Sequence, residues 1–127
     1  MRMSAMKLFL DDYEDGLRDH RYVDATLPDL PFRDEAFDLV LCSHLLFTWA
    51  GEALDARFLA RAALEMARVG KEVRIFPLLD KQGQPTPLLA PLRRALEQRG
   101  HASEIVKVPY EFQKGANEML RVVRFGL

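Results

Sequence analysis

The pattern of apolar and polar positions predicts helices and strands in turn along the first half of the chain. Residues 4–17 place apolar side chains at helical spacing and acids on the other face, which indicates an amphipathic helix ending near Gly16. Residues 22–26 form a short strand-like piece that two prolines bring to an end. Residues 37–42 form an apolar run broken only by Asp38, which is typical of a strand buried on both faces.

The second half of the chain predicts two more helices and three more strands. On the first of these helices the apolar side chains form one stripe, and the charged side chains Arg57, Arg61, Glu65 and Arg68 lie mostly on the wet side. The predicted elements are a helix at 53–69 stopped by Gly70, a strand at 72–79, a helix at 87–99, and strands at 105–108 and 119–125.

Strands that alternate with helices of this length indicate a layered α/β fold with a mostly parallel sheet and helices on both faces. The last two strands lack an intervening helix, so they are expected to pair antiparallel. The chain has 127 residues, which suffices for one modest domain with a real core.

Composition then narrows the functional classes. The 18 basic and 19 acidic side chains nearly cancel, so no electrostatic footprint for nucleic acid or an anionic membrane is visible. The single cysteine excludes an internal disulfide, and no Cys/His cluster has zinc-ligand spacing, so no metal site is expected. No apolar run approaches the ~20 residues that span a bilayer. The N-terminus turns acidic too early for a secretory signal, so a cytoplasmic protein is expected.

An acidic residue, an "LPF" segment, a polar turn and an "FDLV" strand follow one another in the first half of the chain. They are Asp24, the LPF of residues 30–32, and the FDLV of residues 37–40. This order resembles the central part of class I S-adenosylmethionine-dependent methyltransferases, and the similarity continues through GKEVRIFPLL and VPYEFQKGANEML. The resemblance implies a Rossmann-like methyltransferase sheet with an antiparallel last strand, and S-adenosylmethionine as cofactor.

In that family a glycine-rich turn after the first strand cradles the methionine end of the cofactor, and an acid after the second strand binds the ribose. No two of the seven glycines here form a G-x-G. The resemblance therefore implies one truncated domain over residues 1–127, which lacks the family's first strand, first helix and second strand. We expect S-adenosylmethionine binding by this chain alone to be weak or absent.

The same truncation leaves the strand from Phe37 to Cys42 as an open, apolar edge, which is an aggregation liability unless it is covered. It also leaves residues 22–26 without their family partner. We expect the edge to be covered by a rearranged N-terminal segment, by a second copy in a homodimer or larger homo-oligomer, or by a missing N-terminal segment of the natural protein.

The resemblance also assigns candidate cofactor contacts. Asp24 matches the family acid that hydrogen-bonds the adenine amino group, with the Ala25 N–H beside it. Ser43 and His44 follow the buried strand on the side where methyl donor and acceptor meet, and His44 is the candidate general base. The alternative for His44 is a loop histidine bonded to backbone, and for Asp24 a surface aspartate opening a turn.

Candidate substrate contacts are aromatic and amide side chains. Trp49 and its apolar neighbours Leu45, Leu46 and Phe47 either wall an acceptor pocket or pack in the core, and Cys42 is expected to be a small core residue. The loop between the last two strands reaches the same rim if the strand before it is parallel to the others. Its candidates are Tyr110, Phe112 and Asn117, with Gln113 and Lys114 beside them, and the alternative is a loop anchored by its own aromatic side chains.

These observations favour a methyltransferase-like domain with an unidentified acceptor, for which a small molecule is one candidate. The alternative is a non-catalytic module that uses the remaining half of the fold for oligomerisation or partner binding. A different nucleotide-binding α/β domain is a third hypothesis, and the absent glycine loop counts against it.

Overall fold

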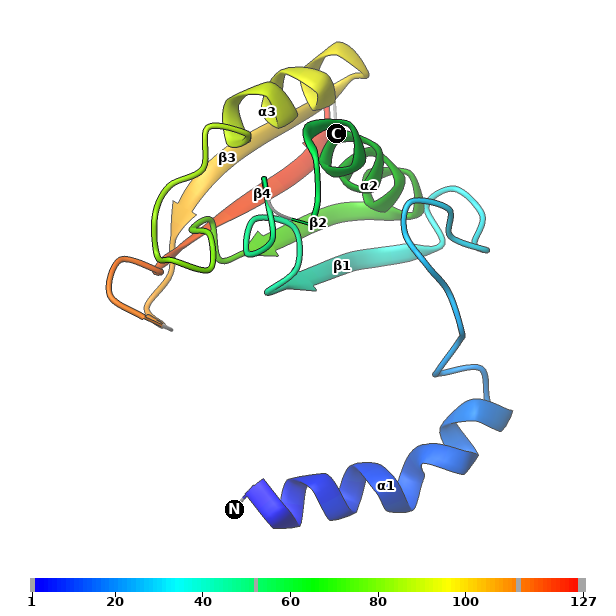
Figure 1. Ribbon diagram of the computed structural model, residues 1–127. Coiled ribbons are helices and arrows are strands. Elements are labelled where there is room, and N and C mark those ends of the chain that lie inside the picture. Colours follow the sequence, from blue (N-terminus) through cyan, green and yellow to red (C-terminus); the bar gives the residue numbers. More distant parts are fainter. Residues whose placement is uncertain (1, 52, 112, 126–127) are drawn as a thin grey trace.

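The computed structural model describes residues 2–51, 53–111 and 113–125, and its centre is a four-stranded sheet (Figure 1). Each strand overlaps a segment expected to form one, but β3 begins four residues earlier than the predicted strand at 105–108. In chain order the elements are α1 (Arg2–Arg18), β1 (Phe37–Ser43), α2 (Ala56–Val69), β2 (Gly70–Phe76), α3 (Leu89–Gln98), β3 (His101–Lys107) and β4 (Glu118–Arg124).

The strands lie in the order β1-β2-β4-β3. β1 and β2 are parallel, and β4 lies between β2 and β3 and is antiparallel to both. Three strands therefore point the same way and the last strand points the other way. The predicted α/β fold with an antiparallel last strand is confirmed.

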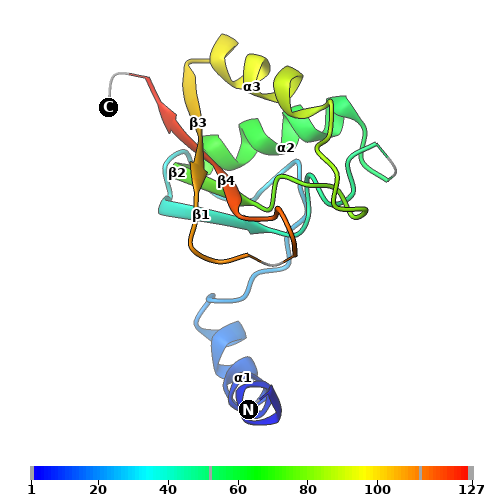
Figure 2. The ribbon, with the colours of Figure 1, turned by 90° about the vertical axis from the view of Figure 1, so that its left-hand side faces the viewer.

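The core lies between the sheet and α2 and α3, which pack on the same face of the sheet (Figures 1 and 2). The predicted helical cover on both faces is not found in the described residues, because α1 lies apart from the sheet. The largest fully buried side chains are Leu46, Phe47, Leu59, Val69, Val73, Ile75, Leu92, Leu96 and Leu120.

The other face of the sheet carries exposed apolar side chains on β1 and charged side chains farther in. Leu39 and Leu41 are 43% and 69% exposed. Beyond them Arg121 lies 3.2 Å from Glu72 and 3.0 Å from Glu104, so the middle strands carry an ion-pair ladder. This face is therefore apolar along its edge strand and polar across its centre.

Local chemistry explains how α2 begins and ends. The Asp55 side chain caps it by accepting a hydrogen bond from the Phe58 N–H at 2.8 Å. Gly70 ends the helix in extended geometry and begins β2 without an intervening loop. A Cβ atom at Gly70 would overlap the Val40 side chain of β1, so glycine is needed here for close approach.

The predicted strand at residues 22–26 is wrong. These residues are not in a strand, and the isolated bridge from Thr26 to Asp29 is the pairing found among them. A strand needs a partner to satisfy its backbone groups, and the sheet offers none near this segment. Tyr22 instead packs on α1, edge-on to Phe9 and stacked with Tyr13.

A cluster of Glu65 and Arg68 on α2 holds the segment that leads into β1. Glu65 accepts a hydrogen bond from the Leu30 N–H at 2.7 Å, and Arg68 donates to the Leu30 carbonyl at 3.2 Å and to Asp34 at 2.9 Å. Arg68 also donates to Glu65 at 2.8 Å. The sequence places both side chains on the wet side, but Glu65 is 15% exposed and Arg68 34%. They are half-buried because the LPF segment covers them.

We predict that Glu65→Gln lowers the free energy of unfolding at pH 7 by about 1–3 kcal/mol, the usual cost of losing hydrogen bonds to a charged group. The hydrogen bond from Arg68 lowers the pKa of Glu65 below its ordinary value of 4.5, although burial raises it. The carboxylate therefore stabilises the fold fully above pH 4.5, and this stability is lost as the pH falls through the lower folded-state pKa.

Urea unfolding at several pH values checks this prediction. The gap between wild type and Glu65→Gln should narrow on acidification, because the protonated glutamate then resembles glutamine. Glu14→Gln, an exposed position on α1, is the control and should stay close to wild type at each pH. A gap that is the same at pH 7 and pH 3 would contradict the assignment.

Candidate functional site

The candidate site lies at the carboxyl ends of β1 and β2, the side of an open α/β sheet where ligands usually bind. β1 ends at Ser43, and the His44 N–H donates to the Phe76 carbonyl at 2.8 Å. His44 has a φ of 57°, in the left-handed region that a residue with a Cβ seldom adopts. The chain thus turns sharply at His44 and places its ring at the rim.

Ser43 and His44 form a polar pair at this rim. The Ser43 Oγ and the His44 Nδ1 lie 2.7 Å apart, within hydrogen-bond distance. Ser43 is exposed and His44 is half-buried. The Ser43 hydroxyl on Nδ1 orients the imidazole, and the other ring nitrogen, Nε2, is buried.

An aromatic row connects His44 with the loop after β3. The His44 and Phe76 rings lie edge-on with centroids 6.0 Å apart, and Phe76 lies 6.1 Å from Tyr110. Tyr110 is therefore at the same rim as His44, as the direction of β3 predicts. The row offers an apolar surface beside a titratable group.

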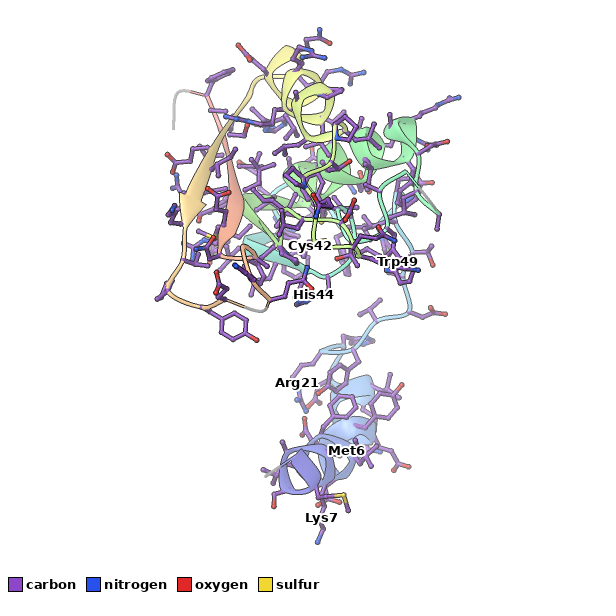
Figure 3. The ribbon with its side chains drawn as sticks, turned by 60° about the vertical axis from the view of Figure 1, so that its left-hand side comes forward. Met6, Lys7, Arg21, Cys42, His44 and Trp49 are labelled. Carbon is purple, nitrogen blue, oxygen red and sulfur yellow. The ribbon has the colours of Figure 1, made fainter. Side chains whose placement is uncertain are left out.

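Trp49 lies in the turns that follow β1 (Figure 3). The Lys81 Nζ lies 4.9 Å from the centre of the Trp49 ring, and the Lys81 N–H donates to the Thr48 carbonyl at 3.0 Å. Trp49 is 39% exposed, whereas Leu46 and Phe47 are buried in the core. Of this group, Trp49 and the exposed Leu45 remain available to a substrate.

For the other candidates, in the loop between β3 and β4, the structure gives backbone hydrogen bonds of Gln113 and Asn117. The Asn117 carbonyl accepts from the Val108 N–H at 2.8 Å, so Asn117 helps to close the loop between β3 and β4. The Gln113 carbonyl accepts from the Ala116 N–H at 2.8 Å. Phe112 lies outside the described residues. The substrate roles of Tyr110, Phe112 and Asn117 stay predictions.

Cys42 is a core residue, as predicted. It is buried under α2, and this burial raises the pKa of its thiol. The thiol is thus held in its neutral form, and Cys42 contributes packing at the end of β1.

Asp24 and Ala25 lie away from this rim. Both are exposed, and they line a shallow hollow of about 550 Å³ with residues 26–29 and Pro31. Neither Ser43 nor His44 lines that hollow. The two pairs of predicted cofactor contacts are therefore not brought together within this chain, and their roles stay predictions.

Two other classes of site were searched within the described ranges. No group of three or more His, Cys, Asp or Glu side chains there could hold a metal ion. No helix of the described part is long and apolar enough to cross a membrane.

Sequence reasoning missed the contacts of Glu65 and Arg68 with Leu30 and Asp34, in the segment that leads into β1. The signal was weak, because an acid and an arginine three residues apart on a helix usually form only a surface pair. Their partners Leu30 and Asp34 lie more than 30 residues earlier in the chain.

Comparison with known proteins gives a family match and one relative. The sequence profile of the family described as "Methyltransferase domain" matches residues 4–73. An uncharacterized protein of Methanocaldococcus jannaschii is 31% identical over 123 residues. That alignment covers 97% of this chain and 52% of the relative, so the chain spans about half the length of the curated relative it matches. No solved structure matches the chain.

The profile match covers more than half of the chain, from α1 into β2. It includes Asp24, Ser43, His44 and Trp49, whereas Tyr110 and Asn117 lie beyond it. The sheet order and the antiparallel β4 agree with the fold of this family, so the structure and the profile match point to the same family. The chain belongs to the methyltransferase domain family of class I S-adenosylmethionine-dependent methyltransferases.

Proposed function

We propose that this chain forms the acceptor-binding part of an S-adenosylmethionine-dependent methyltransferase domain whose acceptor is unidentified. The observation that carries the proposal is the family's sheet order, with the Ser43–His44 pair at the carboxyl end of β1. The family match supports the reaction class. It does not identify the methyl acceptor.

His44 is the proposed general base. An acceptor hydroxyl or amine loses a proton when it is methylated, and an imidazole placed beside it can take that proton. Ser43, 2.7 Å from Nδ1, is the proposed positioning residue that holds the ring. Correct placement of the acceptor supplies much of the remaining rate.

The aromatic side chains near His44 favour an acceptor that is partly apolar. Phe76 and Tyr110 form a row with His44, and Trp49 with Lys81 lies on the turn beside it. Binding sites for small molecules are mostly apolar, with a few polar groups that fix orientation. A small molecule with a ring or an alkyl group next to its nucleophile fits this description.

The described residues do not fit S-adenosylmethionine as a complete pocket, because the hollow at Asp24 and Ala25 excludes Ser43 and His44. We propose that a further polypeptide segment completes the cofactor site. It is either the rest of a longer protein or a second copy of this chain. The same segment would cover the free edge of β1.

The second candidate function is a non-catalytic binding module. It is supported by the exposed apolar side chains of α1, which lies apart from the sheet in the described part of the chain (Figure 1). These side chains are Met3, Met6, Leu8, Phe9, Leu10, Tyr13 and Leu17. A surface of this kind is typical of a protein interface.

We predict that titration calorimetry of this chain with S-adenosylmethionine detects no binding, or binding far weaker than that of a complete methyltransferase. The reason is that the predicted contacts lie in separate places and no glycine-rich turn is present. Tight one-to-one binding would refute the proposal that a further segment is needed.

The second arm of that experiment tests the reaction class itself. If the coding frame upstream of Met1 encodes a strand followed by a G-x-G turn, the extended protein should bind S-adenosylmethionine. Asp24→Asn should weaken that binding, and Asp19→Asn, an exposed neighbour, should not. An extended protein that does not bind would favour the non-catalytic module.

We predict that this chain self-associates at micromolar concentration, because its edge strand and α1 expose apolar side chains. Sedimentation velocity should show a concentration-dependent species larger than the monomer, and Leu41→Asp on β1 should shift it toward the monomer. Arg57→Asp on α2 is the matched exposed control and should leave it unchanged. A strictly monomeric wild type would instead favour the rest of a longer protein as the cover.

A further inference from the structure

A second hollow lies at the opposite end of the sheet from His44. α2 and α3 both run back along the sheet, so their last turns lie at the amino-terminal ends of β2 and β3. The antiparallel β4 ends at the same place. The hollow there has a volume of about 470 Å³, and Arg61, Arg68, Arg99, His101 and Arg124 are among its lining residues.

The charges of this hollow are unbalanced. Its acids are already engaged, because Glu65 pairs with Arg68 at 2.8 Å and Asp29 lies 4.0 Å from Arg61. Arg99 and Arg124 have no acidic partner among the described residues. Two guanidinium groups therefore line one hollow with an excess charge equal and opposite to that of a phosphate dianion.

The backbone brings Arg99 and Arg124 together. Gly100, with a φ of 87°, turns the chain directly after α3, a conformation that glycine adopts without strain. The Gly100 carbonyl accepts from the Phe125 N–H at 2.9 Å, and His101 pairs with Arg124 in the ladder of β3 and β4. The helix dipole favours a cation at the end of α3 and accounts for Arg99, but Arg124 belongs to a strand.

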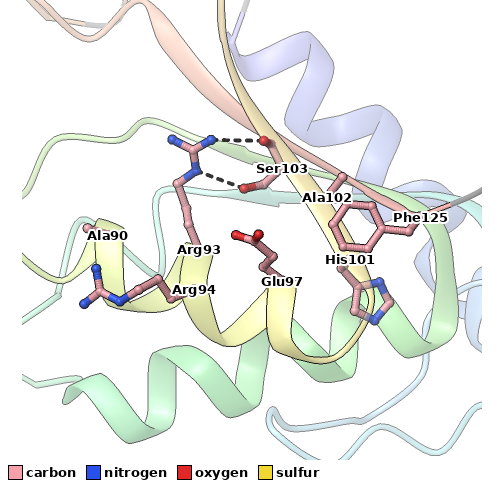
Figure 4. A pocket seen from close by; sticks show the side chains of 8 residues that line it. All are labelled: Ala90, Arg93, Arg94, Glu97, His101, Ala102, Ser103 and Phe125. Atoms are coloured by element: carbon pink, nitrogen blue, oxygen red, sulfur yellow. Dashed lines mark hydrogen bonds between the residues drawn. The ribbon is translucent and has the colours of Figure 1, made fainter.

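His101 lines both this hollow and a neighbouring one of about 410 Å³, which Figure 4 shows. It is 7% exposed. Burial lowers the pKa of His101, and the charge of Arg124 lowers it further. Arg99 and Arg124 line the hollow and are both exposed, so their guanidinium groups are accessible to a ligand from solution.

We propose that this hollow binds the phosphate group of a phosphorylated small molecule through Arg99 and Arg124, with His101 beside it. Arginine is well suited to this role because its planar group donates two parallel hydrogen bonds to phosphate oxygens. The hollow is larger than a phosphate ion, which leaves room for an organic group. The site is separate from the proposed methyl-transfer rim and does not depend on methyl transfer.

The ring of His101 provides the readout. A bound dianion stabilises the imidazolium, so binding should raise the pKa of His101. Several charged groups around this ring bear on the same titration. They are Asp29 of the segment before β1, Arg61, Glu65 and Arg68 of α2, Arg93, Arg94, Glu97 and Arg99 of α3, and Arg124 of β4.

The test is an NMR titration of the His101 ring with inorganic phosphate and, separately, with glycerol 3-phosphate, using sodium chloride at equal ionic strength as the blank. We expect saturable shifts and a higher His101 pKa with at least one of the two phosphates. Tighter binding of glycerol 3-phosphate would identify an organic phosphate as the ligand, and tighter binding of inorganic phosphate would identify the free ion. Shifts that match the chloride blank would overturn the proposal.

Variants separate binding from folding. Arg99→Gln and Arg124→Gln should each weaken phosphate binding about tenfold, as expected for a lost hydrogen bond to a charged group. Arg124→Gln should also raise the His101 pKa of the free protein while reducing the further rise caused by phosphate. Arg57→Gln, exposed on α2 and outside both hollows, is the control. Equal binding by Arg57→Gln and Arg124→Gln would contradict the site.

Discussion

The structure depends on the packing of α2 against one face of the sheet. Ala62, Ala63 and Ala67 are small and buried, so the helix backbone approaches the strands closely, and Leu59 and Met66 fill the space beside them. Each large side chain buried in this way contributes about 1.5–3 kcal/mol. Gly70 allows the helix to pass directly into β2, so the core helix and the core strand form one continuous unit. The remaining elements attach to this unit.

The chain direction of α2 and β2 gives the two ends of the sheet different side chains. At the carboxyl ends of β1 and β2 the chain turns away from the core and leaves His44 and Phe76 in ring contact. At the amino ends, Arg68 in the last turn of α2 and Arg99 at the C-cap of α3 add positive charge, which is favourable at a helix C-terminus. The antiparallel β4 adds Arg124 to that end instead of to the rim with His44. One change of strand direction thus makes the second end more basic.

Much of this fold could be predicted from local patterns. Three features depend only on residues that are neighbours in the sequence. They are the apolar run that starts at Phe37, the end of a helix at Gly70, and the absence of a helix before β4. The prediction of a strand at residues 22–26 was wrong, because a strand needs a pairing partner and the sequence pattern does not show whether one is present. The cluster of Glu65 and Arg68 was missed because its partners come from a distant segment. The same limit applies to the site at Arg99 and Arg124, which the sheet topology alone brings together.

The position of α1 constrains what can complete the domain. Arg68 fixes the segment at Leu30 and Asp34, and Tyr22 is packed on α1, so about half a dozen residues connect the helix to the sheet. A short connection keeps the apolar side chains of α1 within reach of whatever lies on the open face of the sheet. A partner that only added a strand beside β1 would satisfy backbone groups but leave α1 uncovered. A strand beside β1 together with a helix against α1 would cover both surfaces, and a second copy of this chain contains both kinds of element.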